Sequence, residues 1–424
     1  MLDPKFIREH VDEVKRNILR RRVDLDVDEL MNLDADRTEL HQEIDVLRRE
    51  RNEIAEKMKN TVVDERPTLV ERGRALKQEV AVKEEALKTI EAAWQTLMLK
   101  VPNMTHPDSP DGLDDSQNKE LKRGGGEVAR PSFKPRSHVE LAQLHDLIDF
   151  ERGAKVAGAK FYFLKGKLAV LQQALAFWVM QQIVAKGYMP MITPDVANEA
   201  SLVGAGFAPR GPETQIYSLE NTDLSLIGTA EIPLNGYHQG EILEQAQLPL
   251  RYVGVSHCFR TEAGTYGRES YGLYRVHQFL KVEMVVFSTP EQSEAMHEEI
   301  RAIEEELMNL LRVPYRVVDI CTGDLGGPAY RKYDLEAWMW GRGDGQGDWG
   351  EVTSCSNCTD YQARRLNIRY RAADGSVAHV HTLNGTGAAL SRLPIAILEN
   401  YQQENGSILV PEVLRPLCGF DRIG

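Results

Sequence analysis

Two neighbouring segments carry the side-chain types that a nucleotide site needs. The first reads Phe259-Arg260-Thr261-Glu262, and the second runs from Arg275 to Glu283 after a polar, glycine-rich loop. Their patterns predict two antiparallel strands joined by that loop. The facing surface would offer a guanidinium for phosphate, an aromatic ring for a purine and two carboxylates, supplied by Arg260, Phe279, Glu262 and Glu283. We therefore expect nucleotide chemistry at these strands.

Two later segments carry groups that accompany phosphates. In Glu351-Val352-Thr353-Ser354, the two-residue period of a strand predicts that Glu351 and Thr353 share one face. Carboxylate and hydroxyl oxygens suit Mg²⁺. The segment from Thr382 to Gly387 leads into a predicted helix with Arg392 in its first turns, and a helix start with an arginine favours an anion. Both segments are candidates for the phosphate end of a nucleotide site.

Several of these residues also have a purely structural interpretation. Arg260 on its own is as consistent with a structural ion pair as with a phosphate ligand. Thr229 and Glu231 fit an ordinary helix N-terminus, where a hydroxyl and a carboxylate are common. The chain also lacks a GxxxxGK[ST] loop and a GxGxxG between a strand and a helix, so other residues must hold any phosphate.

The spacing Cys355-Ser356-Asn357-Cys358 raises the question of a metal or redox site. His379 and His381 could complete a zinc site, but their spacing is unconventional. Both histidines also fall in an alternating run that is typical of a strand. We therefore interpret them as structural and expect no zinc.

The elements that must position the candidate residues lie in the second part of the chain. From about residue 137, helical periodicity mixes with strand-like runs such as 251–255, 281–287 and 331–340. Strands outnumber the crossover helices that a parallel sheet would need. We therefore predict an α+β body over residues 137–424, an antiparallel β-sheet flanked by helices.

Residues 28–101 follow a helical pattern of a different kind. Apolar residues occupy seven of nine heptad seam positions over 30–58 and eight of ten over 69–101, with a break containing Pro67 between them. Sustained heptads around a short break predict an antiparallel coiled-coil hairpin. A helix from Asp28 to Lys59 would reach roughly 50 Å, too long to lie across one compact domain. The pattern leaves open whether this arm is a spacer, a dimerisation bundle or a binding device.

Length and composition bound the remaining properties. The chain has 424 residues, a net charge of −13 and five cysteines, and residues 102–135 contain several prolines and a run of three glycines. We predict a helical arm over 1–110, a linker over 111–136 and the body over 137–424. Unpaired cysteines, with no leader-like or membrane-length apolar run, predict a cytoplasmic protein. The acidic net charge and the mixed charges at 48–59 favour a solvated helix face over an RNA contact.

The order of these motifs resembles the class II aminoacyl-tRNA synthetases, and most closely the bacterial type of seryl-tRNA synthetase. The matching segments are 259–262, 275–283, 351–354, 384–387 with Arg392, 399–402, 228–234, 187–194 and 410–416. With the arm and the opening residues, the resemblance covers nearly the whole chain. It implies a ligase that uses ATP and Mg²⁺ to form seryl-adenylate from L-serine and then charges tRNA(Ser), with tRNA(Sec) as a second candidate. It also implies a homodimer.

The resemblance implies a role for each motif residue. Catalysis would rest on Arg260, Arg392 and Glu351. The ATP-binding set would be Arg260, Thr261, Glu262, Val276, Phe279, Glu351, Val352, Thr353, Ser354 and Arg392, with Glu351 and Ser354 also holding Mg²⁺. The serine-binding set would be Thr229, Ala230, Glu231, Glu283 and Thr386, and we expect the last two to hold the serine hydroxyl. Because strand alternation alone puts Ser354 on the face opposite Glu351, the shared metal requires a local bend or bulge.

The resemblance further implies that the arm reads the long variable arm and elbow of the tRNA. Two alternatives differ in class: an amino acid:carrier-protein ligase and a non-catalytic, RNA-binding paralogue of a synthetase. The long arm argues against the first, and the retained motif residues argue against the second. Two positions depart from the family pattern. Tyr271 replaces an expected arginine that would contact the tRNA acceptor end, and Ser391 replaces the more usual glycine or proline.

Overall fold

The computed structural model describes residues 1–60, 62, 65–207, 215–262 and 272–424. The chain divides into two compact units, Met1–Pro102 and Asn103–Gly424. Tyr271 lies outside the described residues. Among the helices that the structure describes, none is long and apolar enough to cross a membrane.

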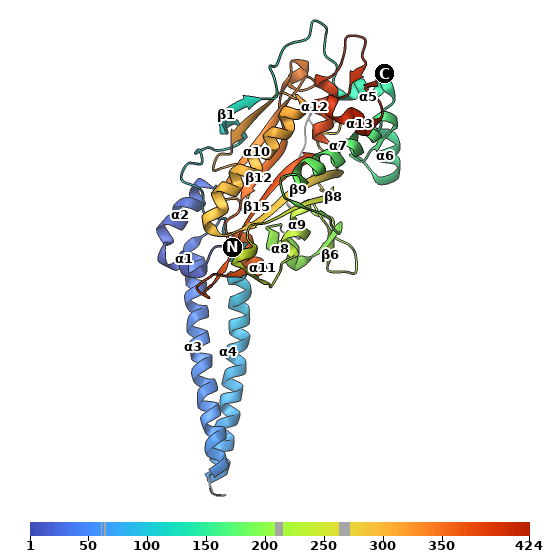
Figure 1. Cartoon of the computed structure of the whole chain (residues 1–424). Helices are drawn as coiled ribbons and strands as arrows, with labels where there is room; N and C mark the ends of the chain where they lie inside the picture. The colour runs from blue at the N-terminus through green and yellow to red at the C-terminus, as the bar shows by residue number, and fades with distance from the viewer. Residues whose placement is uncertain (61, 63–64, 208–214, 263–271) are drawn as a thin grey trace. The chain divides into compact units, whose positions relative to one another are not determined.

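The first unit is helical throughout. Two short helices, α1 (Pro4–Glu9) and α2 (Val11–Arg20), precede the long pair α3 (Val27–Asn60) and α4 (Arg66–Lys100). Figure 1 shows α3 and α4 running side by side as a hairpin. The heptad seam positions that the structure describes are buried or half-buried, while most positions between them are exposed. The predicted antiparallel coiled coil is therefore confirmed, and its cause is the apolar seam.

The heptad seam also accommodates polar side chains. The guanidinium of Arg37, a seam residue, lies 4.2 Å from the ring centroid of Trp94 on α4. Ion pairs at the edges of the seam join the two helices further along, including Arg48 with Glu84 at 2.8 Å and Lys83 with Glu43 at 2.7 Å. These exposed pairs contribute little stability each, so the seam itself is the main source of helix association.

The second unit is built on an eight-stranded sheet in the order β1-β10-β11-β12-β15-β9-β8-β4. The strands are β1 (Lys119–Gly124), β10 (Tyr315–Asp319), β11 (Arg331–Met339), β12 (Asp348–Asn357), β15 (His381–Ala389), β9 (Gln278–Ser288), β8 (Leu250–Phe259) and β4 (Met189–Ile192). All neighbours pair antiparallel except β4 and β8, which are parallel. The predicted antiparallel pairing is therefore confirmed for the body of the sheet, and the parallel pair at the β4 edge makes the sheet mixed. The long connection from β4 to β8 allows the parallel pair.

Residues 119–124 lie within the segment for which we predicted a linker. They form β1, which pairs with β10 from Lys119 opposite Asp319 to Gly124 opposite Tyr315. The charged residues of this strand read as linker polarity in the sequence, yet they suit an exposed edge strand.

The two long helices of this unit pack in the core beside the large sheet. The long helices α7 (Gly166–Val184) and α10 (Ser293–Leu311) contribute to one large apolar core with β9, β11 and β15 (Figure 1). The other helices are α5 (His138–His145), α6 (Phe150–Ala157), α8 (Glu199–Ala205), α9 (Glu231–Gly236), α11 (Tyr361–Leu366), α12 (Arg392–Asn400) and α13 (Arg415–Cys418). Small sheets join β7 (Ile242–Glu244), β13 (Arg369–Arg371) and β14 (Val377–His379); β2 (Ile148–Asp149) and β3 (Phe163–Leu164); β5 (Val196–Asn198) and β6 (Leu224–Leu226); and β16 (Ile408–Leu409) and β17 (Arg422–Ile423). The α+β class is confirmed.

Candidate active site

A polar cavity of about 340 Å³ opens on the face of the sheet opposite α10. Its lining includes Arg260, Glu262, Tyr274, Arg275, Val276, Phe279, Lys281, Lys332, Glu351, Val352, Thr353, Ser354, Thr386 and Arg392. Every predicted ATP-binding residue is in this set except Thr261, and of the predicted serine-binding residues Thr386 is in it. A larger cavity of about 780 Å³, beside residues 125–133, is lined by none of the predicted site residues. The polar cavity is therefore the candidate active site.

Arg260 follows β8 directly and lies beside the aromatic ring that β9 supplies. Its guanidinium is 5.3 Å from the ring centroid of Phe279, and its Nε and Nη2 each donate to the carbonyl of Gly228 at 3.3 Å. Among the described residues, no carboxylate pairs with it. The structural ion pair that we considered for Arg260 is thus not found within the described part of the chain.

Glu262 takes an unusual backbone conformation at the rim of the cavity. Its φ of 50° lies in the left-handed region, which a residue with a side chain adopts at a cost in free energy. Its carboxylate accepts a hydrogen bond from Arg275 Nη1 at 3.4 Å. Arg275, which lies just before β9, therefore contacts the carboxylate that we predicted to face the adenine edge.

Arg392 begins α12 and forms an ion pair with Glu351 on β12. The Nη1–Oε2 distance is 2.9 Å, and the same guanidinium donates to the backbone carbonyls of Glu351 and Tyr274 at 3.3 Å each. Burial opposes ionisation of Glu351, but the nearby charges of Arg392 and Lys332 outweigh it and lower its pKa to about 2. The pair therefore remains ionised at neutral pH.

A β-bulge in β12 decides which side chains face the cavity. Glu351 pairs with Glu336 and Thr353 pairs with Leu335, so Val352 is the extra residue. Thr353 consequently points to the opposite face, where its Oγ1 donates to Glu304 on α10 at 3.2 Å. Our expectation that Glu351 and Thr353 share a face was wrong because it assumed a regular strand. The bulge instead brings Ser354 to the face of Glu351, as the resemblance required.

Glu283 on β9 is fully buried, with 0% of its surface exposed. Its carboxylate accepts hydrogen bonds from Thr386 Oγ1 at 3.1 Å and Asn384 Nδ2 at 3.3 Å, and pairs with Lys281 Nζ at 2.7 Å. Three donors from two adjacent strands thus compensate for the burial of this charge. A small polar ligand at this point would meet both a hydroxyl and a carboxylate.

Glu231 lies in the first turn of α9, next to Glu283. Gln362 Nε2 donates to its carboxylate at 2.7 Å, and its backbone N–H donates to Thr229 Oγ1 at 3.2 Å. Burial, with the charge of Glu283 second, raises the pKa of Glu231 to about 7. The Thr229 hydroxyl therefore accepts a hydrogen bond from the first turn of α9, which agrees with the structural interpretation of this motif. Ala230 lies between Thr229 and Glu231, just before the helix begins.

The sequence analysis missed several polar residues of the site, including Tyr274 and Arg275 in the cavity lining. Lys281 and Asn384 each lie two residues before a predicted ligand, Glu283 and Thr386, so strand alternation could have identified them. Lys332 on β11 lines the cavity and pairs with Asp334 at 3.0 Å. Gln362 reaches Glu231 from α11, 131 residues away in sequence, and no local pattern indicates that contact.

None of the cysteines that the structure describes lines the polar cavity. Cys355 and Cys358 are buried, and the thiol of Cys358 contacts Asn384 Oδ1 at 3.9 Å. In the described part of the chain, no three His, Cys, Asp or Glu side chains come together as a metal site.

Two family descriptions match the chain. Residues 1–105 match the seryl-tRNA synthetase N-terminal domain, and residues 216–401 match the tRNA synthetase class II core domain (G, H, P, S and T). The serine–tRNA ligase of Treponema denticola is 54% identical over 425 residues, with 100% of each chain covered. That of Rubrobacter xylanophilus is 52% identical, with 100% and 99% covered. The crystal structure of seryl-tRNA synthetase from Pyrococcus horikoshii complexed with ATP matches with a TM-score of 0.89 at 40% identity, covering 100% of this chain and 99% of that one.

Proposed function

The chain belongs to the seryl-tRNA synthetase family, and from this membership we propose that it is a ligase that activates L-serine with ATP and then charges tRNA(Ser). One observation carries the proposal. A single polar cavity joins a phosphate end, marked by Arg260, Arg392 and Glu351, to an end at Thr386, whose hydroxyl donates to the buried Glu283. A site for serine must contact ATP in this way, because the amino-acid carboxylate has to reach the α-phosphate.

ATP binds along the phosphate end. Phe279 stacks on adenine, Glu262 faces its edge, and Arg260 contacts the α-phosphate while Arg392 contacts the terminal phosphates. The rest of the predicted ATP set, Thr261, Val276, Val352 and Thr353, adds backbone and apolar contacts. These roles rest on the family motifs, and the cation–π contact between Arg260 and Phe279 supports the joint use of the two side chains.

Mg²⁺ fits the oxygen donors that the bulge places on one face of β12. Glu351 offers a carboxylate and Ser354 a hydroxyl, a sparse set of the kind Mg²⁺ uses when phosphates and water complete its shell. The bound ion neutralises part of the charge on the ATP phosphates. The Glu351 carboxylate, which pairs with Arg392 at 2.9 Å, would hold the metal where Arg392 contacts the phosphates instead.

Serine binds at the buried end. The ammonium group of serine meets Glu231 near Thr229 and Ala230, and its hydroxyl meets Glu283 and Thr386. A serine carboxylate oxygen attacks the α-phosphorus, the bond to the β,γ-diphosphate breaks, and pyrophosphate leaves with seryl-adenylate formed. A terminal ribose hydroxyl of the tRNA then attacks the seryl carbonyl, and AMP leaves. The side chains supply position and charge rather than a nucleophile.

Amino-acid-dependent exchange of pyrophosphate into ATP tests the first step. With the common amino acids tried one at a time, serine should support exchange and the others should not. Absence of exchange with serine would refute the proposed activity. Arg260→Ala should abolish exchange with little change in thermal unfolding, and near-normal exchange in that variant would remove Arg260 from the site.

The helical arm is the proposed reader of tRNA. Serine codons share no base at any one position across both codon boxes, so recognition of tRNA shape away from the anticodon suits this amino acid. The first unit, Met1–Pro102, and the match of residues 1–105 to the seryl-tRNA synthetase N-terminal domain support this assignment. tRNA(Sec) is the second acceptor that we propose, and charging assays with both purified tRNAs decide between one acceptor and two.

A homodimer is proposed at the β4 edge of the sheet. Ile192 and Met189 on this edge strand are 93% and 60% exposed, and Phe177 on α7 is 47% exposed. An edge strand flanked by exposed apolar side chains is an interface candidate. Ile192→Lys should shift the sedimentation coefficient from dimer to monomer, whereas Val156→Lys on α6 should not. A wild-type chain that sediments as a monomer contradicts the proposal.

A further inference from the structure

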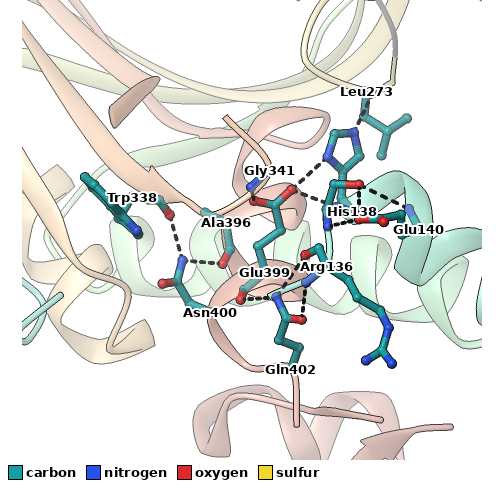
Figure 2. A network of polar contacts seen from close by, with 11 residues as sticks. Arg136, His138, Glu140, Leu273, Trp338, Gly341, Ala396, Glu399, Asn400 and Gln402 are labelled. Atoms are coloured by element: carbon teal, nitrogen blue, oxygen red, sulfur yellow. Dashed lines mark hydrogen bonds and ion pairs between the residues drawn. The ribbon is translucent and has the colours of Figure 1, made fainter. Parts of the chain in front are cut away.

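A buried carboxylate on α12 joins segments that are far apart in the sequence. The side chain of Glu399 is fully buried, and both of its oxygens accept hydrogen bonds (Figure 2). Oε1 accepts from the backbone N–H of His138 at 2.8 Å and from its Nδ1 at 2.9 Å. Oε2 accepts from the backbone N–H of Gly341 at 2.8 Å. Glu399 therefore fixes the start of α5 and the turn after β11 together.

The partners of His138 assign its tautomer. Nδ1 faces a carboxylate, so it carries the proton and donates. Nε2 faces the backbone N–H of Leu273 at 3.2 Å, so it must accept (Figure 2). The imidazole thus links Glu399 to Leu273 through one hydrogen bond that it donates and one that it accepts. Gly272 lies so close that a Cβ there would come within 2.3 Å of Nε2, and its φ of 101° also favours glycine.

Glu399 is connected to Tyr274 in two ways, through His138 to Leu273 and through Gly341 to Arg342. Leu273 precedes Tyr274 in the chain, and Gly341 precedes Arg342, whose guanidinium lies 4.5 Å from the Tyr274 ring centroid. The guanidinium of Arg392 lies at the same distance from this ring and also donates to the Tyr274 carbonyl at 3.3 Å. The two cations and the ring form one stack at the phosphate end of the cavity.

These contacts form a closed path. Arg392 and Glu399 are both on α12, seven residues apart, which is about two helical turns, so they project from similar sides of the helix. From Glu399 the path runs through His138, Leu273 and Tyr274 back to Arg392. A closed path of hydrogen bonds and stacked groups restricts each member more than a single contact would.

We propose that Glu399 and His138 are positioning residues that set Tyr274, and through it the guanidinium of Arg392, for the terminal phosphates of ATP. The inference rests on the proposed function, because it takes the contact between Arg392 and those phosphates from there. Neither residue lies close enough to ATP to touch it in this scheme. A purely structural role would instead be to attach α5 to α12, and it would leave nucleotide selectivity unchanged.

The test compares the binding of ATP and AMP by calorimetry, because AMP lacks the terminal phosphates. His138→Asn keeps a side-chain N–H for Glu399 but removes the acceptor for Leu273. Losing one buried hydrogen bond should weaken ATP binding by about tenfold and leave AMP binding nearly unchanged. His138→Gln, whose longer amide can place an oxygen near Leu273, should restore part of the loss.

The control is His145→Asn on the same helix, where the histidine bonds to the carbonyl of Gly406 at 2.7 Å and faces away from the site. It should leave the binding of both nucleotides unchanged. If His138→Asn fails to fold, Glu399→Gln, which keeps the side-chain shape but loses one acceptor, should lower ATP binding selectively. Equal effects on ATP and AMP, or none, overturn the inference.

Arg392→Ala separates this inference from its premise. If Arg392→Ala lowers ATP binding selectively and His138→Asn does not, the positioning role is wrong and the phosphate contact stands. If Arg392→Ala has no selective effect, the phosphate contact itself is wrong and the inference falls with it. Serine activation is tested independently by exchange, because neither binding measurement contains serine.

Discussion

The charged side chains of the candidate active site are held differently at its two ends. At the phosphate end, Arg392 pairs with Glu351 and, against the effect of burial, lowers the pKa of that carboxyl to about 2. At the serine end, burial beside Glu283 raises the pKa of Glu231 to about 7. The ion pair keeps both of its members charged, whereas a carboxyl near its midpoint at neutral pH responds to the arrival of an ammonium group.

Glu231 should make serine binding depend on pH. Because its pKa is raised to about 7, the carboxyl is largely protonated below that pH and largely ionised above it. The KM for serine in the exchange assay should therefore fall as pH rises from about 6 to about 8, since the ionised form attracts the serine ammonium. Glu231→Gln should raise this KM and flatten its pH dependence. A wild-type KM that does not change over this range contradicts the assignment.

Thr386 should contribute to the choice of serine over alanine. Its hydroxyl donates to Glu283 at 3.1 Å, and a site that hydrogen-bonds a substrate hydroxyl rejects the analogue without it. Thr386→Val keeps the side-chain shape and should lower the ratio of kcat/KM for serine to that for alanine by about tenfold or more. Thr322→Val provides the matched control, because that buried threonine bonds to Gly112 outside the cavity. An unchanged ratio in Thr386→Val would exclude the residue from serine recognition.

At the scale of elements, the bulge in β12 depends on the strand and helix beside it. Pairing with β11 makes Val352 the extra residue, and α10 receives the Thr353 side chain on the far face. Glu304 on α10 accepts a hydrogen bond from that hydroxyl at 3.2 Å. The close approach continues at β15, where a Cβ on Gly385 would come within 2.2 Å of Ile300. Tight packing of α10 against two strands thus sets the face that Glu351 and Ser354 present.

The buried carboxyl of Glu304 should make stability depend on pH. Burial, with the charge of Glu283 second, raises its pKa well above the ordinary value of 4.5. The native state therefore keeps a proton that the unfolded chain releases, so this group costs stability increasingly as pH rises above that value. Glu304→Gln should be more stable than the wild type in urea at about pH 8, with the difference shrinking toward about pH 5.

Glu306→Gln is the matched control for that prediction. Glu306 is on the same helix but its side chain is 48% exposed and pairs with Lys186. Its replacement should change the free energy of unfolding little at either pH. A Glu304→Gln variant that loses stability at the higher pH would show that the native state holds Glu304 ionised.

At the scale of the whole molecule, the two units have different sources of order. Met1–Pro102 is held by a narrow seam between two helices, whereas Asn103–Gly424 has one large core beneath its sheet. Every residue of the candidate active site belongs to the second unit. The chemistry of activation and the proposed reading of tRNA shape are therefore assigned to separate parts of the chain.

Removal of the arm should separate the two steps of the reaction. Asp36–Leu97 can be replaced by a short Gly-Ser connection. The two helices are close together where they are cut, since the guanidinium of Arg37 lies 4.2 Å from the ring centroid of Trp94. Serine-dependent exchange should persist, while tRNA(Ser) charging should fall by about 100-fold or more because the shape contacts are lost. Charging that survives the deletion would mean that the arm is a spacer.

The sequence by itself determined the features that depend on local periodicity. The heptads of α3 and α4 predicted a hairpin, because a 3.5-residue repeat puts the apolar side chains of each helix along one side, where a second helix can cover them. Alternation identified β8, β9 and β11, and the motif residues pointed to the cavity before any strand order was known. Local periodicity succeeds here because it fixes which side of its own element each side chain occupies.

Tertiary structure decided which of those sides meet. The pairing of β12 with β11 leaves Val352 as the extra residue of a bulge, so strand alternation assigned the Thr353 side chain to the wrong face. The parallel pairing of β4 with β8 follows from a long connection that has no local signature. Glu399 and His138 meet across 261 residues, and Gln362 and Glu231 across 131. Such contacts depend on strand order and helix packing, which reflect the total free energy of the fold rather than the preference of any one segment.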